Sequence, residues 1–440
     1  MLELLAPAGD LEKLHAGLQY GADAVYFGGG TFSLRAAAAH FSPMDTAEAV
    51  RLCRKQGVKA YLTLNIYPHD EDVEPLTTFL RSLKAAADIM KDHAGKACLP
   101  DAFIVSDPGV LAILKDVLPQ VGTTDGATAG PEIHLSTQAN VTSAPAAKFW
   151  YGQGVRRLIL ARELSLIEIA KIRDQIPDDM ALEAFVHGAI CMAYSGRCLL
   201  SNYLNGRDSN RGQCSQPCRW EYTLEEAKRP GEHFPIEEDE RGTYLLSAND
   251  LCMIEHIPEL VKAGISSFKI EGRMKSAYYV ASIVRAYRWA IDAAQKGEPY
   301  DPLWFAELEK ASHRRFSTGF FYGVPGKNQL EEITEAPEHG EGMEYIRDYE
   351  FLGNVLGYDA ETGLARVEVR GKFSLGEAIE IFGPTPGFSE ITVGELYDES
   401  MRPLDAAASA MQIVYLKIAS PMQPNDMIRR ARRRRWRPGT

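Results

Sequence analysis

Short hydrophobic runs alternate with longer amphipathic stretches over about the first 275 residues of the chain. Eight of the runs are rich in aliphatic and β-branched residues, as buried strands are, and the stretches between them have helical periodicity. The predicted strands are Glu3–Ala6, Ala24–Phe27, Lys59–Asn65, Ala102–Ser106, Ile133–Ser136, Arg157–Ala161, Leu182–His187 and Ser267–Glu271. Eight successive β-α units predict an α/β fold, a TIM-type (β/α)8 barrel.

The interval between the seventh and eighth predicted strands contains a ninth strand-like run, Thr243–Ser247. An insertion or an irregular unit must occupy this interval, so the pattern predicts a closed barrel but leaves the strand pairing there open. We predict a barrel domain over residues 1–330, with a cysteine-rich insertion at about 188–242.

The pattern changes after residue 345 to short alternating runs separated by glycine, such as Phe351–Gly357 and Ala365–Val369. These runs predict a small antiparallel β-barrel domain over residues 345–428, and the Glu-rich residues 331–344 are predicted to be a linker. Residues 429–440 are predicted to be a basic tail, because seven arginines fall between 429 and 437. Such a tail is typical of a solvated terminus or of a phosphate-binding segment.

The whole chain is acidic, with 48 Lys and Arg against 60 Asp and Glu and a formal net charge of −12. This balance excludes a generally basic nucleic-acid binder and requires a local basic patch for any RNA contact. No apolar run reaches the roughly 20 residues of a membrane span, and Met1 leads directly into a predicted strand. We therefore expect a cytoplasmic protein with no membrane partner.

Most of the predicted strands end in polar residues, and in a (β/α)8 barrel the carboxyl ends meet on the face that carries active sites. A single polar strand end is usually just solvated, but the whole set favours a binding site. The residues are Asn65, Gln138, Arg162, His187, Glu271 and Arg273.

Seven cysteines, an odd number in a long chain, argue against a disulfide scaffold. Four of them have the spacing C-x6-C-x15-C-x3-C and are predicted metal ligands: Cys191, Cys198, Cys214 and Cys218. Zinc sites usually have closely paired cysteines, whereas a wide first pair suits an iron–sulfur cluster equally well, so the spacing leaves both open. Four arginines would offset the thiolate charge: Arg197, Arg207, Arg211 and Arg219.

Six motifs carry a resemblance to a known family: Glu3–Asp10, Tyr20–Tyr26, Glu183–Cys191, Tyr194–Cys198, Cys214–Arg219 and Phe268–Arg273. On these motifs the chain resembles the peptidase U32 family, the collagenase-like protease family. Within the family it is most similar, through residues 191–201 and 218–222, to the bacterial branch implicated in hydroxylating the wobble uridine of tRNA. The small β-domain corresponds to the family's C-terminal module.

The resemblance implies formation of 5-hydroxyuridine in tRNA, dependence on prephenate as a co-substrate, and a 4Fe–4S cluster on the four cysteines. Prephenate is a small dicarboxylate and tRNA a polyanion, and arginines bind both kinds of group. The predicted substrate-binding residues are Arg162, Arg197, Arg219, Arg273, Asn65 and Gln138. His187 and Glu271 are predicted to transfer protons. The sequence neither requires nor excludes a related second subunit.

Two other functions fit the sequence. The first is a U32-type peptidase that cleaves peptides or unfolded protein, with a metal or Cys191 as its catalytic centre, although no H-E-x-x-H or G-x-S-x-G motif occurs. The second is a non-enzymatic RNA-binding assembly factor in which the metal centre is structural.

Overall fold

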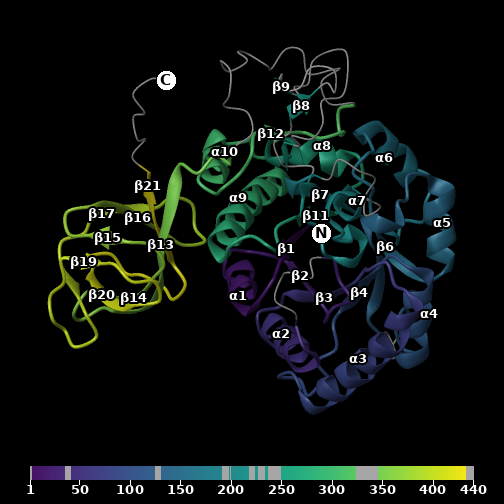
Figure 1. Cartoon of the computed structure of the whole chain (residues 1–440), viewed down its shortest axis with the longest axis horizontal. Coiled ribbons are helices and arrows are strands. Elements are labelled where there is room, and N and C mark those ends of the chain that lie inside the picture. Colours follow the sequence, from purple (N-terminus) through teal and green to yellow (C-terminus); the bar gives the residue numbers. More distant parts are fainter. Residues whose placement is uncertain are drawn as a thin grey trace.

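The computed structural model of the chain (Figure 1) describes residues 2–34, 41–123, 130–190, 198, 200–217, 223–225, 233–235, 249–323 and 345–432. The predicted ninth strand, the predicted linker and residues 433–440 of the predicted tail lie outside these ranges.

All eight predicted barrel strands are present, and they are parallel. Hydrogen-bonded pairs run in the order β11, β1, β2, β3, β4, β5, β6, β7, and a further pairing of β7 with β11 closes the ring. The strands are β1 (Glu3–Pro7), β2 (Ala24–Gly28), β3 (Lys59–Leu64), β4 (Ala102–Val105), β5 (Glu132–Leu135), β6 (Val155–Ile159), β7 (Ala181–Ala189) and β11 (Ser267–Ile270). The predicted (β/α)8 barrel is therefore confirmed.

Helices surround the barrel (Figure 1). They are α1 (Leu11–Gln19), α2 (Pro43–Lys55), α3 (Asp70–Ile89), α4 (Pro108–Val117), α5 (Ala144–Gly152), α6 (Leu166–Arg173), α8 (Ile257–Lys262), α9 (Ala277–Lys296) and α10 (Pro302–Glu309). Capping boxes fix where two of them begin, with Ser42 and Asp45 at α2 and Ser165 and Glu168 at α6. No described helix combines the length and apolar character that crossing a membrane requires.

The interval between β7 and β11 is the irregular part of the barrel domain. It contains α7 (Leu200–Asn205), the short strands β8 (Thr223–Glu225) and β9 (His233–Pro235), and β10 (Asp250–Cys252). β10 pairs antiparallel with the end of β7 and parallel with β12 (Phe316–Ser317). Sequence patterning missed β10 because its pairing covers only three residues.

The C-terminal domain is antiparallel, as predicted. Its seven-stranded sheet has the order β17, β16, β21, β13, β14, β20, β18. The strands are β13 (Tyr349–Asp359), β14 (Leu364–Val369), β16 (Ala378–Phe382), β17 (Ser389–Thr392), β18 (Leu396–Tyr397), β20 (Ile413–Lys417) and β21 (Met427–Ala431), with β15 (Phe373–Ser374) and β19 (Ala406–Ala407) pairing separately. This domain lies beside α1, α9 and α10 (Figure 1).

The boundary predicted for the basic tail was wrong, because Arg429 and Arg430 belong to β21. Arg429 is fully buried between the domains, where it pairs with Glu307 of α10 and donates from Nε to Glu380 at 2.7 Å. Arg430 pairs with Glu350 at 2.9 Å. Ion pairs with glutamates therefore hold the first two arginines of the predicted tail in the sheet and at the domain interface.

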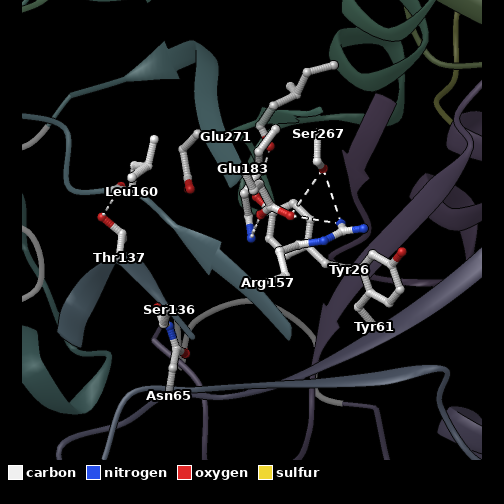
Figure 2. A network of polar contacts seen from close by, with 12 residues as sticks. Tyr26, Tyr61, Asn65, Ser136, Thr137, Arg157, Leu160, Glu183, Ser267 and Glu271 are labelled. Atoms are coloured by element: carbon white, nitrogen blue, oxygen red, sulfur yellow. Dashed lines mark hydrogen bonds and ion pairs between the residues drawn. The ribbon is translucent and has the colours of Figure 1, made fainter. Parts of the chain in front are cut away.

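Buried charges connect the barrel strands that come from distant parts of the sequence (Figure 2). Arg157 on β6 donates to Glu3 on β1 and to Glu183 on β7, both at 3.1 Å. Ser267 on β11 donates to the same two carboxylates at 3.0 and 3.2 Å, and Lys269 donates to Glu183 at 3.0 Å. Each buried charge therefore has an opposite charge within hydrogen-bonding distance, which buried ions require.

Burial alone would raise the pKa of Glu3, but the hydrogen bonds and charge of Arg157 offset it and hold the pKa at about 2. Because this pKa is lower in the folded than in the unfolded chain, the ionised pair stabilises the fold at neutral pH. The contribution is lost as the pH falls from about 4.5 toward 2.

Replacing Arg157 with methionine leaves Glu3 buried without its cationic partner and leaves Glu183 with Lys269 alone. We expect Arg157→Met to lower the free energy of unfolding by about 3–5 kcal/mol, measured by urea denaturation. The matched control is Arg51→Met, which removes only a surface pair with Glu48 and should change stability little. An equal decrease in the free energy of unfolding of the two variants would contradict the claim that the buried network stabilises the fold.

Candidate active site at the carboxyl end of the barrel

Polar side chains from the loops after β3 and β5 meet at the carboxyl end of the barrel, called the mouth below. Asn65 follows β3, and its Nδ2 donates to Ser136 Oγ at 3.1 Å and to Gln138 Oε1, both after β5. Asn65 Oδ1 accepts the Leu34 amide at 3.3 Å. Both predicted binding residues, Asn65 and Gln138, are thus brought together and are largely buried.

A second group at the mouth carries charge. Arg162, after β6, lies with its Nη2 3.9 Å from a carboxylate oxygen of Glu271, which follows β11. The Arg162 guanidinium stacks 4.0 Å from the centre of the Phe185 ring. Predicted residues from strands far apart in the sequence therefore form one ion pair above an aromatic ring.

Lys269 is the mouth residue that sequence analysis missed. It is 4% exposed, and its Nζ lies 4.3 Å from the centre of the Tyr26 ring and 5.4 Å from that of Phe185. Burial lowers its pKa, although the charge of Glu183 acts in the opposite direction. The sequence did contain a signal for it, because a lysine inside a predicted buried strand must have a partner for its ammonium group.

Arg273, also predicted as a binding residue, is 5% exposed and donates to Ser33 Oγ at 3.1 Å. Gly28 allows this approach, since a Cβ there would lie 2.2 Å from Ser33 Oγ and 2.7 Å from Arg273 Nη1. The loops after β2 and β11 are thus connected at the mouth.

His187 points away from the barrel interior. The pairing of β7 with β11 shifts register, with Phe185 opposite Lys269 and His187 opposite Ile270, so that Val186 is an extra residue. A bulge reverses the alternation of side chains, and His187 therefore faces α9. The next residue, Gly188, has φ +100°, and a Cβ there would lie 2.7 Å from the Glu271 carbonyl oxygen.

The environment of His187 is aromatic and dry. Its ring centre lies 5.4 Å from those of Tyr287 and Phe316 and 6.1 Å from that of Tyr279. Burial, with the charges of His313 and Lys275, lowers the pKa of His187 to about 3. The imidazole is therefore neutral at physiological pH, and its proposed role in proton transfer stays a prediction.

Part of the cysteine-rich insertion crosses the mouth. We call residues 198 and 200–217 the bridging segment. The segment follows β7, and its residue Asn210 accepts the amide of Tyr67, after β3, at 3.1 Å. In the closed ring β3 lies four strands from β7 in either direction. The bridging segment therefore connects opposite sides of the barrel over its carboxyl end.

A hydrogen bond joins the two parts of this segment that carry its described cysteines. Ser201 and Ser215, near Cys198 and Cys214, are bonded through their hydroxyls at 3.0 Å. Cys214 Sγ accepts the amide of Gln216 at 3.3 Å. Amide hydrogen bonds to sulfur are a feature of cysteine-bound metal centres, so this loop fits a metal-binding cysteine.

The other two predicted ligands, Cys191 and Cys218, lie outside the described residues, as do the predicted binding residues Arg197 and Arg219. Cys198 and Cys214 are free thiols of intermediate exposure. Within the described residues, no three His, Cys, Asp or Glu side chains form another group able to hold a metal ion. The four-cysteine set stays a prediction.

Comparisons with known proteins agree along the whole chain. A family model described as Peptidase family U32 matches residues 9–331, and one described as Peptidase family U32 C-terminal domain matches residues 347–429. The tRNA hydroxylation protein P1 of Bacillus subtilis is 38% identical over 434 residues, covering 98% of this chain and 95% of the relative. The tRNA hydroxylation protein P of Escherichia coli is 38% identical over 421 residues, covering 87% and 86%. A collagenase of Porphyromonas gingivalis is 32% identical, covering 97% of each chain.

Asn210 holds the bridging segment in two ways, because its Oδ1 also accepts the Cys198 amide at 3.1 Å. Asn210→Ala removes this bond, which is worth about 0.5–1.5 kcal/mol. We expect alkylation of Cys198 in metal-free protein to become about 2- to 10-fold faster, measured by mass spectrometry. The control is Asn202→Ala on the exposed face of α7. Unchanged alkylation in Asn210→Ala would show that this contact does not hold the cysteine.

Proposed function

Because the chain belongs to peptidase family U32, we propose that it is an RNA-modifying enzyme that hydroxylates the wobble uridine of tRNA to 5-hydroxyuridine. The names of its two relatives from Bacillus subtilis and Escherichia coli support tRNA hydroxylation. The structural observation that carries the proposal is the position of the bridging segment, which holds two cysteines over a polar, charged mouth. A redox centre and a nucleobase would meet at that position.

In this proposal Cys191, Cys198, Cys214 and Cys218 hold a 4Fe–4S cluster, with zinc as the alternative. The amide of Gln216 donates to Cys214 Sγ, which is the kind of contact that sets the potential of a bound cluster. When bound, the cluster would supply one-electron chemistry beside the substrate. The chain's own residues would bind and orient the two substrates.

The mouth favours a small anion such as prephenate, the proposed co-substrate. Three of its side chains are cationic: Arg162, which lies beside Glu271, Lys269, which donates to Glu183, and Arg273, which donates to Ser33. An arginine binds a carboxylate through two parallel hydrogen bonds. Asn65 and Gln138, after β3 and β5, add amide groups.

Glu271 is the described carboxylate best placed to accept a proton from a substrate at the mouth. The Arg162 guanidinium, 3.9 Å away, would orient it. His187, neutral and facing α9, would act by hydrogen bonding to shape the end of β7, whose Gly188 packs against the Glu271 backbone.

The proposed macromolecular substrate is tRNA, bound through an unpaired anticodon loop. Unpaired bases enter a pocket without the cost of extraction from a duplex. The chain carries a net charge of −12, so RNA contact would rely on local arginines. A cytoplasmic location is also part of the proposal.

A U32-type peptidase is the second candidate, favoured by the similarity to the Porphyromonas gingivalis collagenase. Its test is peptide cleavage by purified protein. Cleavage that Cys191→Ala abolishes would favour a peptidase, whereas cleavage that survives this change would indicate a contaminant.

The central experiment measures nucleosides of tRNA from a strain lacking this protein and any paralogue. We expect loss of 5-hydroxyuridine and its derivatives, restored by the wild-type protein and by Cys53→Ala, a buried cysteine on α2. Cys214→Ala should restore none, because it removes a proposed cluster ligand. Normal 5-hydroxyuridine in the deletion strain would refute the proposed function.

A further inference from the structure

Two tyrosines at the mouth project into solvent. Tyr203, on α7 of the bridging segment, is 87% exposed, and Tyr67, in the loop after β3, is 59% exposed. Large aromatic side chains normally bury most of their surface, because each one buried gains free energy from leaving water. Tyr203 lies on the bridging segment and Tyr67 in the loop to which that segment is hydrogen-bonded, so both rings are left in water on two connected loops.

One backbone hydrogen bond joins the two loops that carry the tyrosines. The Tyr67 amide donates to Asn210 of the bridging segment at 3.1 Å, and the Tyr67 ring has an edge contact with His69 at 5.9 Å. Tyr203 lies on the short helix that directly follows Cys198 in the same segment, with Leu204 43% exposed beside it. The hydrogen bond holds the backbone of these loops in place. Stacking on the rings would therefore cost little backbone conformational entropy.

The charges around the tyrosines are unequal. Arg207 is exposed on the bridging segment, after α7. The first turn of α3, next to Tyr67, carries Asp70, Glu71 and Asp72. A phosphate backbone would be repelled from the α3 side and attracted to Arg207, whereas uncharged bases would tolerate both sides.

We propose that Tyr203 and Tyr67 stack on unpaired bases of the RNA strand, next to the base that enters the mouth, while Arg207 contacts a phosphate. The inference rests on the proposed function and names the surface through which that function would recognise RNA. An aromatic ring stacks on any base, so the surface would select unpaired strands rather than a sequence.

The test is binding of the anaerobically purified wild-type protein and variants to a fluorescent RNA stem-loop with an unpaired, uridine-containing loop. A fully paired RNA duplex of the same length serves as the comparison. We expect Tyr203→Ala and Tyr67→Ala each to raise the Kd about tenfold, and Tyr203→Trp to bind like wild type. Phe149→Ala, which removes a ring 61% exposed on the outer helix α5, should leave the Kd unchanged.

Arg207→Gln should reduce the slope of log K against log salt by about 0.7, because it removes one proposed phosphate contact.

The outcomes separate the inference from the function on which it rests. Wild-type protein that binds the stem-loop while both alanine variants bind equally well overturns the stacking surface and leaves RNA modification intact. Equal binding of the duplex also overturns it, because a duplex offers no free base faces. Wild-type protein that binds no RNA refutes the proposed function itself. Thermal unfolding of each variant, unchanged from wild type, shows that lost binding is not lost folding.

Discussion

The ion network of Glu3, Arg157 and Glu183 inside the barrel is the interaction on which the arrangement of the molecule depends. Its members come from β1, β6 and β7, and Ser267 of β11 connects them where the ring closes. Hydrophobic strands are compatible with several registers, but buried charges are tolerated only where they meet. We infer that the network selects the register of the closing strands.

That register determines what reaches the mouth. Side chains alternate along β11, so placing Ser267 in the network puts Lys269 above it and Glu271 at the strand's end. On β7 the same register places Phe185 inside, below Arg162. The bulge at Val186 then turns His187 toward α9. The charged mouth and the neutral histidine therefore have a common structural origin.

Much of the fold could be predicted from the sequence, because the eight barrel strands are separate hydrophobic runs between amphipathic helices. The three-residue β10 has no such run, and pairing alone defines it. Arg429 and Arg430 resembled a tail because composition does not show the glutamates that pair with them. Of the site, polar strand ends identified Asn65, Gln138, Arg162 and Glu271. Lys269 could have been found as a charged residue inside a predicted buried strand. The outward turn of His187 and the Tyr67–Asn210 contact depend on register and on a long-range contact, which local patterns do not contain.

We propose a redox centre on the bridging segment, and metal analysis tests this proposal most directly. Iron, acid-labile sulfide and zinc would be measured together in anaerobically purified wild-type protein, Cys214→Ala and Cys53→Ala. We expect about four irons and four sulfides per chain in the wild type and in Cys53→Ala, and the loss of both in Cys214→Ala. One zinc per chain with no iron or sulfide would contradict it.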